Sequence, residues 1–135
     1  MTIPVVVVDN EPVDRHLARR RLSRSDGFGD VTEYSSGEDF VRDLFEKRIP
    51  NTGRNQKTLV LMDISMPRMD GFQTIEASMK HAEQGLQDVL FVMYTSSTIA
   101  FDREVAAGLP HVRGFISKPI DDQDVVDMQK LCAAG

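Results

Sequence analysis

The sequence has a single cysteine, no long hydrophobic run and no secretory leader pattern at its start. Cys132 has no second cysteine with which to form a disulfide within the chain, and such sparse use of cysteine fits a reducing compartment. No apolar run approaches the length of about 20 residues that a membrane-spanning helix needs. A basic region followed by a long apolar core, the mark of a secretory signal, is also missing. These absences predict a cytoplasmic protein that does not enter a membrane.

Positive charge is scarce as well, because 16 Lys and Arg residues face 21 Asp and Glu residues, for a net charge of −5. An acidic chain of this kind argues against general nucleic-acid binding. The local exception is a run of arginines in a predicted helix: Arg15, Arg19, Arg20, Arg21 and Arg24. We interpret this run as a solvated helix face, with a docking surface for an acidic protein partner as the alternative.

The length of 135 residues predicts one domain over 1–135, with no room for a separate effector module. A chain of this size can bury about two-thirds of its surface without disulfides or metals. No internal repeat or interdomain linker is visible. The polar segment 50–57 is long for a connection between elements, and we interpret it as an insertion; a partner contact is the alternative.

Strand and helix patterns alternate along the chain. Strand character is found over 3–8, 30–34, 59–63, 89–93 and 114–116, and helices are predicted after Pro12, after Ser35, and over 71–83, 98–107 and 121–131. Pro12 suits a first helical turn, and Ser35 with Glu38 resembles a capping box. The first two helices are expected to turn these residues inward: Val13, Leu17, Ala18 and Leu22, then Phe40, Val41, Leu44 and Phe45. The alternation predicts a doubly wound α/β fold.

Four of the strand-like runs deliver polar groups at their C-terminal ends. The residues concerned are Asp9, Asp63, Thr95 and Lys118. Parallel strands bring such ends to one edge of the sheet, where ligands of open α/β sheets bind. We therefore expect two carboxylates, a hydroxyl and an ammonium to converge there.

Four motifs in this order, VVVVDNEP, LVLMDISMPRMDG, MYTSS and FISKPI, resemble the receiver domain of two-component response regulators over nearly the whole chain. The resemblance implies a flavodoxin-like, five-stranded parallel sheet of order 2-1-3-4-5 with helices on both faces. It also implies phosphorylation of an aspartate by a sensor histidine kinase or a histidine phosphotransfer protein, and signalling to a downstream protein through a conformational change. Such a domain is not an enzyme in the usual sense, since it assists only its own phosphorylation and dephosphorylation.

The resemblance also implies roles for single residues. Asp63 matches the phosphoacceptor, Lys118 the partner of a phosphoryl oxygen, and Thr95 a hydroxyl that hydrogen-bonds another oxygen. Mg²⁺ or another divalent cation is expected, because an anion approaching an anion needs neutralisation and hard cations prefer oxygen ligands. Asp9, Asp63 and the backbone carbonyl of Ser65 match its protein ligands.

One position departs from the family pattern. The family usually has two adjacent acids after the first strand, whereas this chain has Asp9 and Asn10. An amide oxygen can coordinate a metal but carries no charge. Because residue 10 is Asn, we therefore expect weaker metal binding and slower phosphotransfer. Glu11 could swing in to compensate; we favour an exposed residue at the start of the helix.

Phe115, three residues before Lys118, matches the aromatic switch position of the family. In the family the ring moves inward as the hydroxyl matching Thr95 turns toward phosphate; a static packed ring is the alternative here. The surface of the fourth helix, fifth strand and fifth helix is then the expected readout face, with Phe101 and His111 as possible contributors. The Lys118–Pro119 bond is a candidate for the cis form.

Two other functions fit parts of the pattern. A pseudo-receiver, a protein-interaction module that is not phosphorylated, is supported by Asn10 alone. A phosphatase of the haloacid-dehalogenase type also uses Asp, Thr or Ser, and Lys on a similar sheet. It needs a second Asp two residues after the nucleophile as general acid and base, and this chain has Ser65 there.

Overall fold

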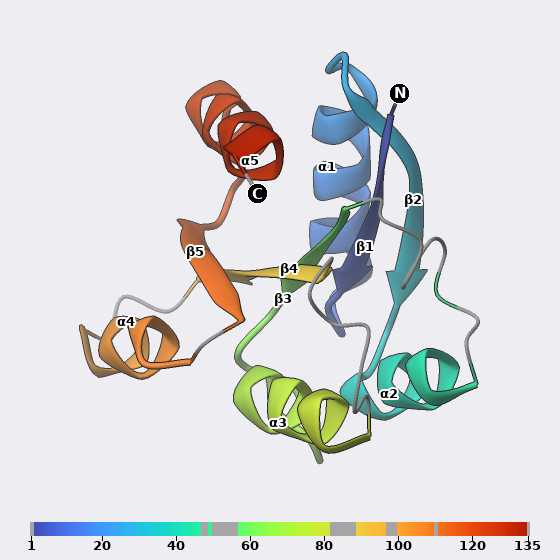
Figure 1. The fold of residues 1–135 in the computed structure, drawn as a ribbon, viewed down its shortest axis with the longest axis vertical. Helices are drawn as coiled ribbons and strands as arrows, with labels where there is room; N and C mark the ends of the chain where they lie inside the picture. The colour runs from blue at the N-terminus through green and yellow to red at the C-terminus, as the bar shows by residue number, and fades with distance from the viewer. Residues whose placement is uncertain are drawn as a thin grey trace.

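The computed structural model describes residues 2–46, 49, 57–81, 89–96, 100–109 and 111–134. Strands and helices alternate strictly along these residues (Figure 1). The strands are β1 (Ile3–Val8), β2 (Phe28–Tyr34), β3 (Thr58–Met62), β4 (Val89–Thr95) and β5 (Val112–Ser117). The helices are α1 (Pro12–Ser23), α2 (Gly37–Phe45), α3 (Gly71–His81), α4 (Ala100–Ala107) and α5 (Asp122–Ala134).

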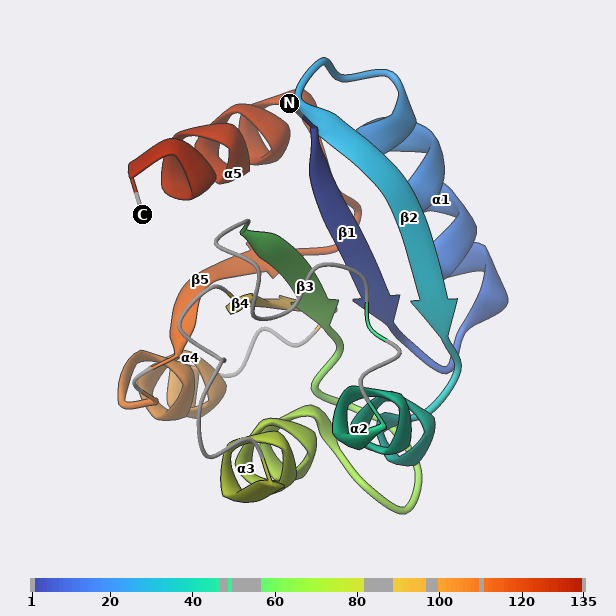
Figure 2. The same cartoon turned by 45° about the vertical axis from the view of Figure 1, so that its right-hand side comes forward.

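The strands form one parallel sheet of order β2-β1-β3-β4-β5. Helices α1 and α5 lie on one face, and α2, α3 and α4 lie on the other (Figures 1 and 2). This is the doubly wound, flavodoxin-like arrangement that the sequence predicted. All five C-terminal strand ends point the same way, which places the residues that follow them at one edge.

The three inner strands are buried on both faces, which explains their uninterrupted apolar runs. In β1, Val5 and Val7 pack toward α1 and α5, whereas Val6 and Val8 pack toward α2 and α3. Every residue of β3 and β4 is buried. The edge strands β2 and β5 are mixed in burial, so their sequences carry a weaker strand signal.

The predicted boundaries need small corrections. Strand β2 begins at Phe28, two residues earlier than expected, and α5 extends to Ala134. Three predictions fall on residues that are not described: the end of the third helix at 83, the start of the fourth helix at 98, and most of the 50–57 segment. Within the described part of the chain, no helix has the length and apolar character to cross a membrane.

The start of α2 corrects the predicted capping box by one residue. Ser36, not Ser35, is the N-cap, and its hydroxyl oxygen accepts a hydrogen bond from the Asp39 backbone N–H at 3.2 Å. Two adjacent serines offer the same capping chemistry, so the residue order alone could not choose between them. The prediction that Pro12 occupies the first turn of α1 is confirmed.

The predicted apolar faces of α1 and α2 are only half right. Ala18 and Leu22 are fully buried, but Val13 is 67% exposed and Leu17 41% exposed. At about 100° per residue, residues 13 and 17 share a helix face that is rotated by about 140° from the face of residues 18 and 22, and only the latter meets the sheet. In α2, Phe40 is buried whereas Phe45 is 62% exposed.

Candidate functional site

The four strand-end residues come together at one edge of the sheet, as the sequence predicted. Asp9 follows β1, Asp63 follows β3, Thr95 ends β4 and Lys118 follows β5. Asp9, Asp63 and Thr95 are buried, and only 9% of the Lys118 side chain is exposed. Buried ionisable groups are rare unless they are paired, so this cluster marks a site.

The main chain fixes three of these residues. The Asp63 N–H donates to the Val8 carbonyl at 2.9 Å, and the Asp9 N–H donates to the Tyr34 carbonyl at 3.0 Å. The Lys118 N–H donates to the Thr95 carbonyl at 2.9 Å. Each bond extends the sheet ladder one residue past a strand, so the backbones of the functional residues share the rigidity of the sheet.

The Lys118 ammonium is the centre of the site. Its Nζ lies 2.6 Å from Asp9 Oδ2, 2.9 Å from Asp14 Oδ2 and 3.6 Å from Asp63 Oδ2. The contact with Asp14 has hydrogen-bond geometry. Sequence reasoning missed Asp14, although a carboxylate in the first turn of the helix that follows β1 was a signal for it.

Burial and charge shift the ionisation of this cluster. Burial, followed by the neighbouring Asp9 carboxylate, raises the pKa of Asp63 to about 6, and Lys118 only partly offsets this. Burial alone would lower the pKa of Lys118, but hydrogen bonding to Asp9 and Asp14 and the charge of Asp63 hold that pKa above its ordinary value. Two carboxylates this close favour a proton or a cation between them.

The donor set fits a hard divalent cation. Asp9 and Asp63 offer carboxylates, half-buried Asn10 offers an amide oxygen, and the exposed Ser65 offers a backbone carbonyl. The buried Asp9 Oδ2 makes no hydrogen bond of regular geometry with the described residues, although it pairs with Lys118. No group of three or more His, Cys, Asp or Glu side chains within the described ranges is placed to hold a metal.

The loop between β3 and α3 is held close beneath Asp63. The Gly71 N–H donates to the Ile64 carbonyl at 2.9 Å. A Cβ at position 71 would lie 2.2 Å from the Asp63 carbonyl oxygen, so only glycine allows this approach. Asp70 and Gln73 cap α3 by accepting each other's backbone N–H groups. The start of α3 is therefore held against the Asp63 backbone.

Not all arginines of α1 form the solvated face that the sequence predicted, because Arg15 contacts the backbone of the site. Arg15 donates through Nη1 to the Asp9 carbonyl at 2.6 Å and pairs through Nε with Glu33 at 3.1 Å. Arg19 also pairs with Glu33, and Arg21 pairs with Asp122. The predicted solvated face thus fits Arg20 and Arg24, which are exposed, better than Arg15.

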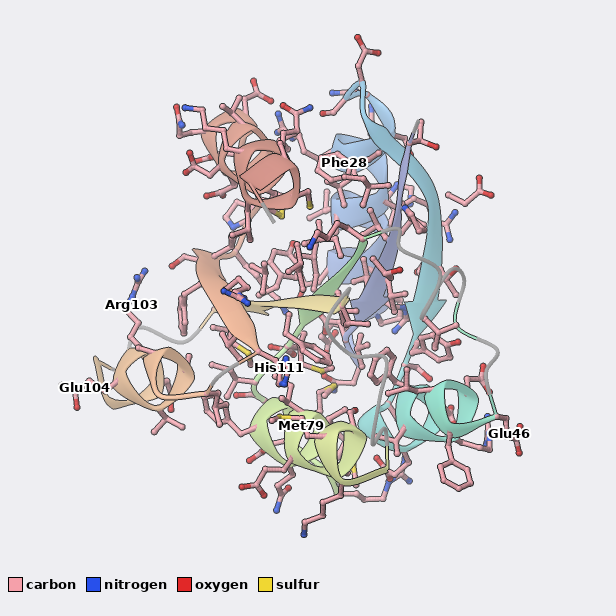
Figure 3. The ribbon with its side chains drawn as sticks, viewed as in Figure 1. Phe28, Glu46, Met79, Arg103, Glu104 and His111 are labelled. Atoms are coloured by element: carbon pink, nitrogen blue, oxygen red, sulfur yellow. The ribbon has the colours of Figure 1, made fainter. Side chains whose placement is uncertain are left out.

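The expected switch residues lie on the two strands predicted for them. Thr95 is buried at the end of β4. Phe115 in β5 is half-buried, and the Arg103 guanidinium carbon lies 4.5 Å from its ring centroid; Figure 3 shows the Arg103 side chain rising from α4 alongside β5. His111 is half-buried, whereas the side chain of Phe101 lies outside the described part. The switch role of Phe115 stays a prediction.

Two further predictions concern the peptide bond after Lys118 and the residue before α1. The Lys118–Pro119 peptide bond is cis, as the sequence suggested. Glu11 is exposed and precedes α1 without a side-chain cap, which agrees with the preferred interpretation of that residue.

A parallel sheet of order 2-1-3-4-5 that gathers two carboxylates, a hydroxyl and a lysine at its C-terminal edge defines a receiver-like class of α/β protein. A family model for the response regulator receiver domain matches residues 5–130. The chain belongs to this family.

Curated relatives and solved structures agree with that assignment. The chain is 30% identical over 119 residues to a response regulatory protein of Yersinia pestis, covering 88% of this chain and 43% of that protein. It is 25% identical over 132 residues to the nitrate/nitrite response regulator protein NarL of Escherichia coli K12, covering 97% of this chain and 55% of NarL. The chain thus spans about half the length of these relatives.

Similar folds are found in solved receiver structures. A two-component response regulator from Cytophaga hutchinsonii superposes with a TM-score of 0.85 at 18% identity, with all of both chains covered. The chemotaxis protein CheY4 of Vibrio cholerae superposes with a TM-score of 0.73 at 17% identity, covering 98% of this chain and 99% of that one. At these identities the likeness establishes the fold.

Proposed function

We propose that this domain is a phosphoacceptor, in which Asp63 takes a phosphoryl group from a histidine of a partner kinase or phosphotransfer protein. The observation that carries the proposal is the position of Asp63: a buried carboxylate at the end of the central strand, with the Lys118 ammonium 3.6 Å away and Asp9 beside it. A buried carboxylate with a raised pKa and a specific charge partner is typical of a functional site.

The proposed step is a phosphoryl transfer between two side chains. An Asp63 carboxylate oxygen bonds to phosphorus as the nitrogen–phosphorus bond of the donor histidine breaks, and the histidine keeps the electron pair and takes up a proton. Lys118 pairs with one phosphoryl oxygen, and the Thr95 hydroxyl donates to another. Mg²⁺, held by Asp9, Asn10, Asp63 and the Ser65 carbonyl, would supply positive charge against the transferring group.

The output would be a change of surface and not turnover of a separate substrate. Phosphate on Asp63 attracts the Thr95 hydroxyl, and the space left behind lets Phe115 repack against β4. The face built by α4, β5 and α5 then differs between the two states, which is what a downstream protein in the cytoplasm needs for recognition. On this proposal the domain catalyses only its own phosphorylation and dephosphorylation.

Intact mass spectrometry after incubation with acetyl phosphate and Mg²⁺ tests the proposal. The wild type should gain one phosphoryl group, Asp63→Asn should gain none, and Asp30→Asn should behave as wild type. Asp30 is an exposed carboxylate in β2, so its variant controls for loss of one negative charge. An adduct that persists in Asp63→Asn would contradict the assignment of the acceptor.

A pseudo-receiver is the second candidate, because Asn10 removes one expected charge from the cation site. It predicts no mass increment in the wild type even with a cognate donor. A phosphatase is disfavoured by Ser65 at the position where a second Asp is required. Turnover of small phosphate esters such as p-nitrophenyl phosphate would reinstate it.

A further inference from the structure

Asp14 is a third carboxylate at the candidate site, and neither the motifs nor the metal ligand set account for it. It lies in the first turn of α1, and its Oδ2 accepts a hydrogen bond of 2.9 Å from Lys118 Nζ across 104 residues of sequence. The side chain is 29% exposed, so the pair is screened on one side only. A pair placed at this depth is stronger than an ordinary surface ion pair.

The position of Asp14 is fixed by its neighbour. Arg15 bonds the Asp9 carbonyl and Glu33 at the same time, which ties the first turn of α1 to the ends of β1 and β2. The backbone that carries Asp14 is therefore held in place, so that its side chain is positioned to bond Lys118. The backbone of Lys118 is likewise held by its hydrogen bond to Thr95. The backbones that carry Asp14 and Lys118 are thus both fixed.

Tyr94 contacts the Lys118 ammonium on the face of the sheet that α1 and α5 cover. Its fully buried ring packs in the core between the sheet and helices α1 and α5, and Lys118 Nζ lies 5.2 Å from the ring centroid. An aromatic face attracts a cation at this distance. Asp14 and Tyr94 together draw the Lys118 ammonium toward α1.

The distances rank the three carboxylates around Lys118. The ammonium lies closest to Asp9 and Asp14, at 2.6 and 2.9 Å, and furthest from the proposed acceptor Asp63, at 3.6 Å. An ammonium has three N–H donors, and one that bonds Asp14 is withheld from a phosphoryl oxygen. The negative charge of Asp14 also opposes any anion that binds to Lys118.

We propose that Asp14 is a positioning residue that restrains Lys118 and lowers the affinity of the Asp63 site for a phosphoryl group. The inference rests on the proposed function. It assigns to this chain a built-in restraint: the lysine that must neutralise the phosphoryl group is shared with a competing carboxylate on α1. A ligand at Asp63 has to draw Lys118 away from Asp14, so its binding energy is reduced by the strength of that pair.

Beryllofluoride, a mimic of the phosphoryl group, provides the test because it binds without a covalent transfer. Titrations with beryllofluoride and Mg²⁺, followed by backbone amide NMR, compare the wild type with Asp14→Asn, Asp14→Glu and Asp30→Asn. Asp14→Asn should bind about three- to tenfold more tightly, the range expected when a competing, partly screened charge is removed. Asp14→Glu, which keeps the charge, and Asp30→Asn should both remain within about twofold of wild type.

A second measurement, made without metal or beryllofluoride, reports on the pair itself. The ammonium ¹H–¹⁵N cross-peak of Lys118, assigned with Lys118→Met, should be visible at low temperature in the wild type, because pairing slows proton exchange. In Asp14→Asn it should shift and broaden while the backbone amide spectrum elsewhere is retained. A merely structural role for Asp14 would leave beryllofluoride affinity unchanged or weaker in a folded Asp14→Asn protein, and either result overturns the inference. Failure of the wild type to bind beryllofluoride or gain a phosphoryl mass would instead count against the proposed function.

Discussion

At the scale of single residues, the site holds charges that folding alone does not favour. Asp63 is 4% exposed and lies beside Asp9, and its pKa is raised because burial and a like charge both disfavour its ionised form. Such a group is retained at a cost in stability when it has chemistry to perform. Two predictions follow from the carboxylates and the amide of this cluster.

Asp63→Asn should stabilise the metal-free protein at pH 7. A carboxyl whose folded pKa is raised to about 6 from 3.8 contributes stability that is complete below its unfolded pKa and is lost as the pH rises through 6. The amide of Asp63→Asn does not ionise, so the variant does not lose this stability. Its free energy of unfolding should exceed that of the wild type by about 1 to 3 kcal/mol at pH 7 and by close to zero near pH 4. Urea unfolding in EDTA at the two pH values measures it, and an equal gain at both would point to packing instead of charge.

Asn10→Asp should tighten the binding of Mg²⁺. A carboxylate replaces a neutral oxygen next to Asp9, and the gain should be on the order of one to a few kcal/mol in this partly solvated position. Mg²⁺ titration followed by amide NMR measures the affinity. Equal or weaker affinity in Asn10→Asp would show that residue 10 does not contact the metal.

At the scale of elements, the ends of strands and the starts of helices position the chemistry. Glycine at 71 lets α3 begin directly under the Asp63 carbonyl. Arg15 ties the first turn of α1 to the end of β1. Helices α1 and α3 are therefore fixed to strand ends near the start of each helix, and we expect a change at such a contact to reach the site without touching a functional side chain.

Gly71→Ala should destabilise the fold by about 2 to 3 kcal/mol, because the new methyl group would meet backbone atoms that cannot rotate away. Gly108→Ala is the matched control: its Cβ would come no closer than 3.6 Å to Val105 O, an ordinary contact, so its effect should stay within about 0.5 kcal/mol. Urea unfolding of both variants gives the comparison. Equal stability of the two variants would mean that the β3–α3 loop can relax around a side chain.

The elements also show what the sequence could and could not reveal. The inner strands were readable because burial on both faces leaves an unbroken apolar run that stops at a polar residue, as at Met62 and Asp63. The faces of α1 were not, because Leu17 and Ala18 differ by one residue and only the packing decides which one is covered. Asp9, Asp63, Thr95 and Lys118 followed from the motifs, whereas the pair of Asp14 with Lys118 depends on how far the Lys118 side chain reaches from the end of β5 toward the first turn of α1.

At the scale of the whole molecule, the proposed signal runs from the edge of the sheet to one side of it. Thr95 and Phe115 belong to β4 and β5, which pair in register with Thr95 opposite Ser117 and Met93 opposite Phe115. A movement at Asp63 can thus reach the face of α4, β5 and α5 through two neighbouring strands.

Thr95→Ala should separate phosphorylation from response. The variant should still gain one phosphoryl group from acetyl phosphate, because Asp63, Asp9 and Lys118 are unchanged. Without the hydroxyl, the two states lose a differential contact, so chemical-shift changes around Phe115 and α5 should fall to a small fraction of those in wild type. Thr95→Ser keeps the hydroxyl and serves as the control. A full response in Thr95→Ala would remove Thr95 from the path.

The sheet order also has a consequence for synthesis on the ribosome. Asp9 and Asp63 leave the exit tunnel well before Lys118, which follows β5. A nascent chain that has released β1 to β4 can pair β1 with β3, yet the two acidic side chains then share an edge without Lys118 to balance them, which disfavours closing that edge. Arrival of the last strand supplies the missing counter-ion as well as an edge strand. Synthesis therefore completes the electrostatics of this domain only after β5 has emerged, and the docking of β5 should be the step that commits the domain to its final form.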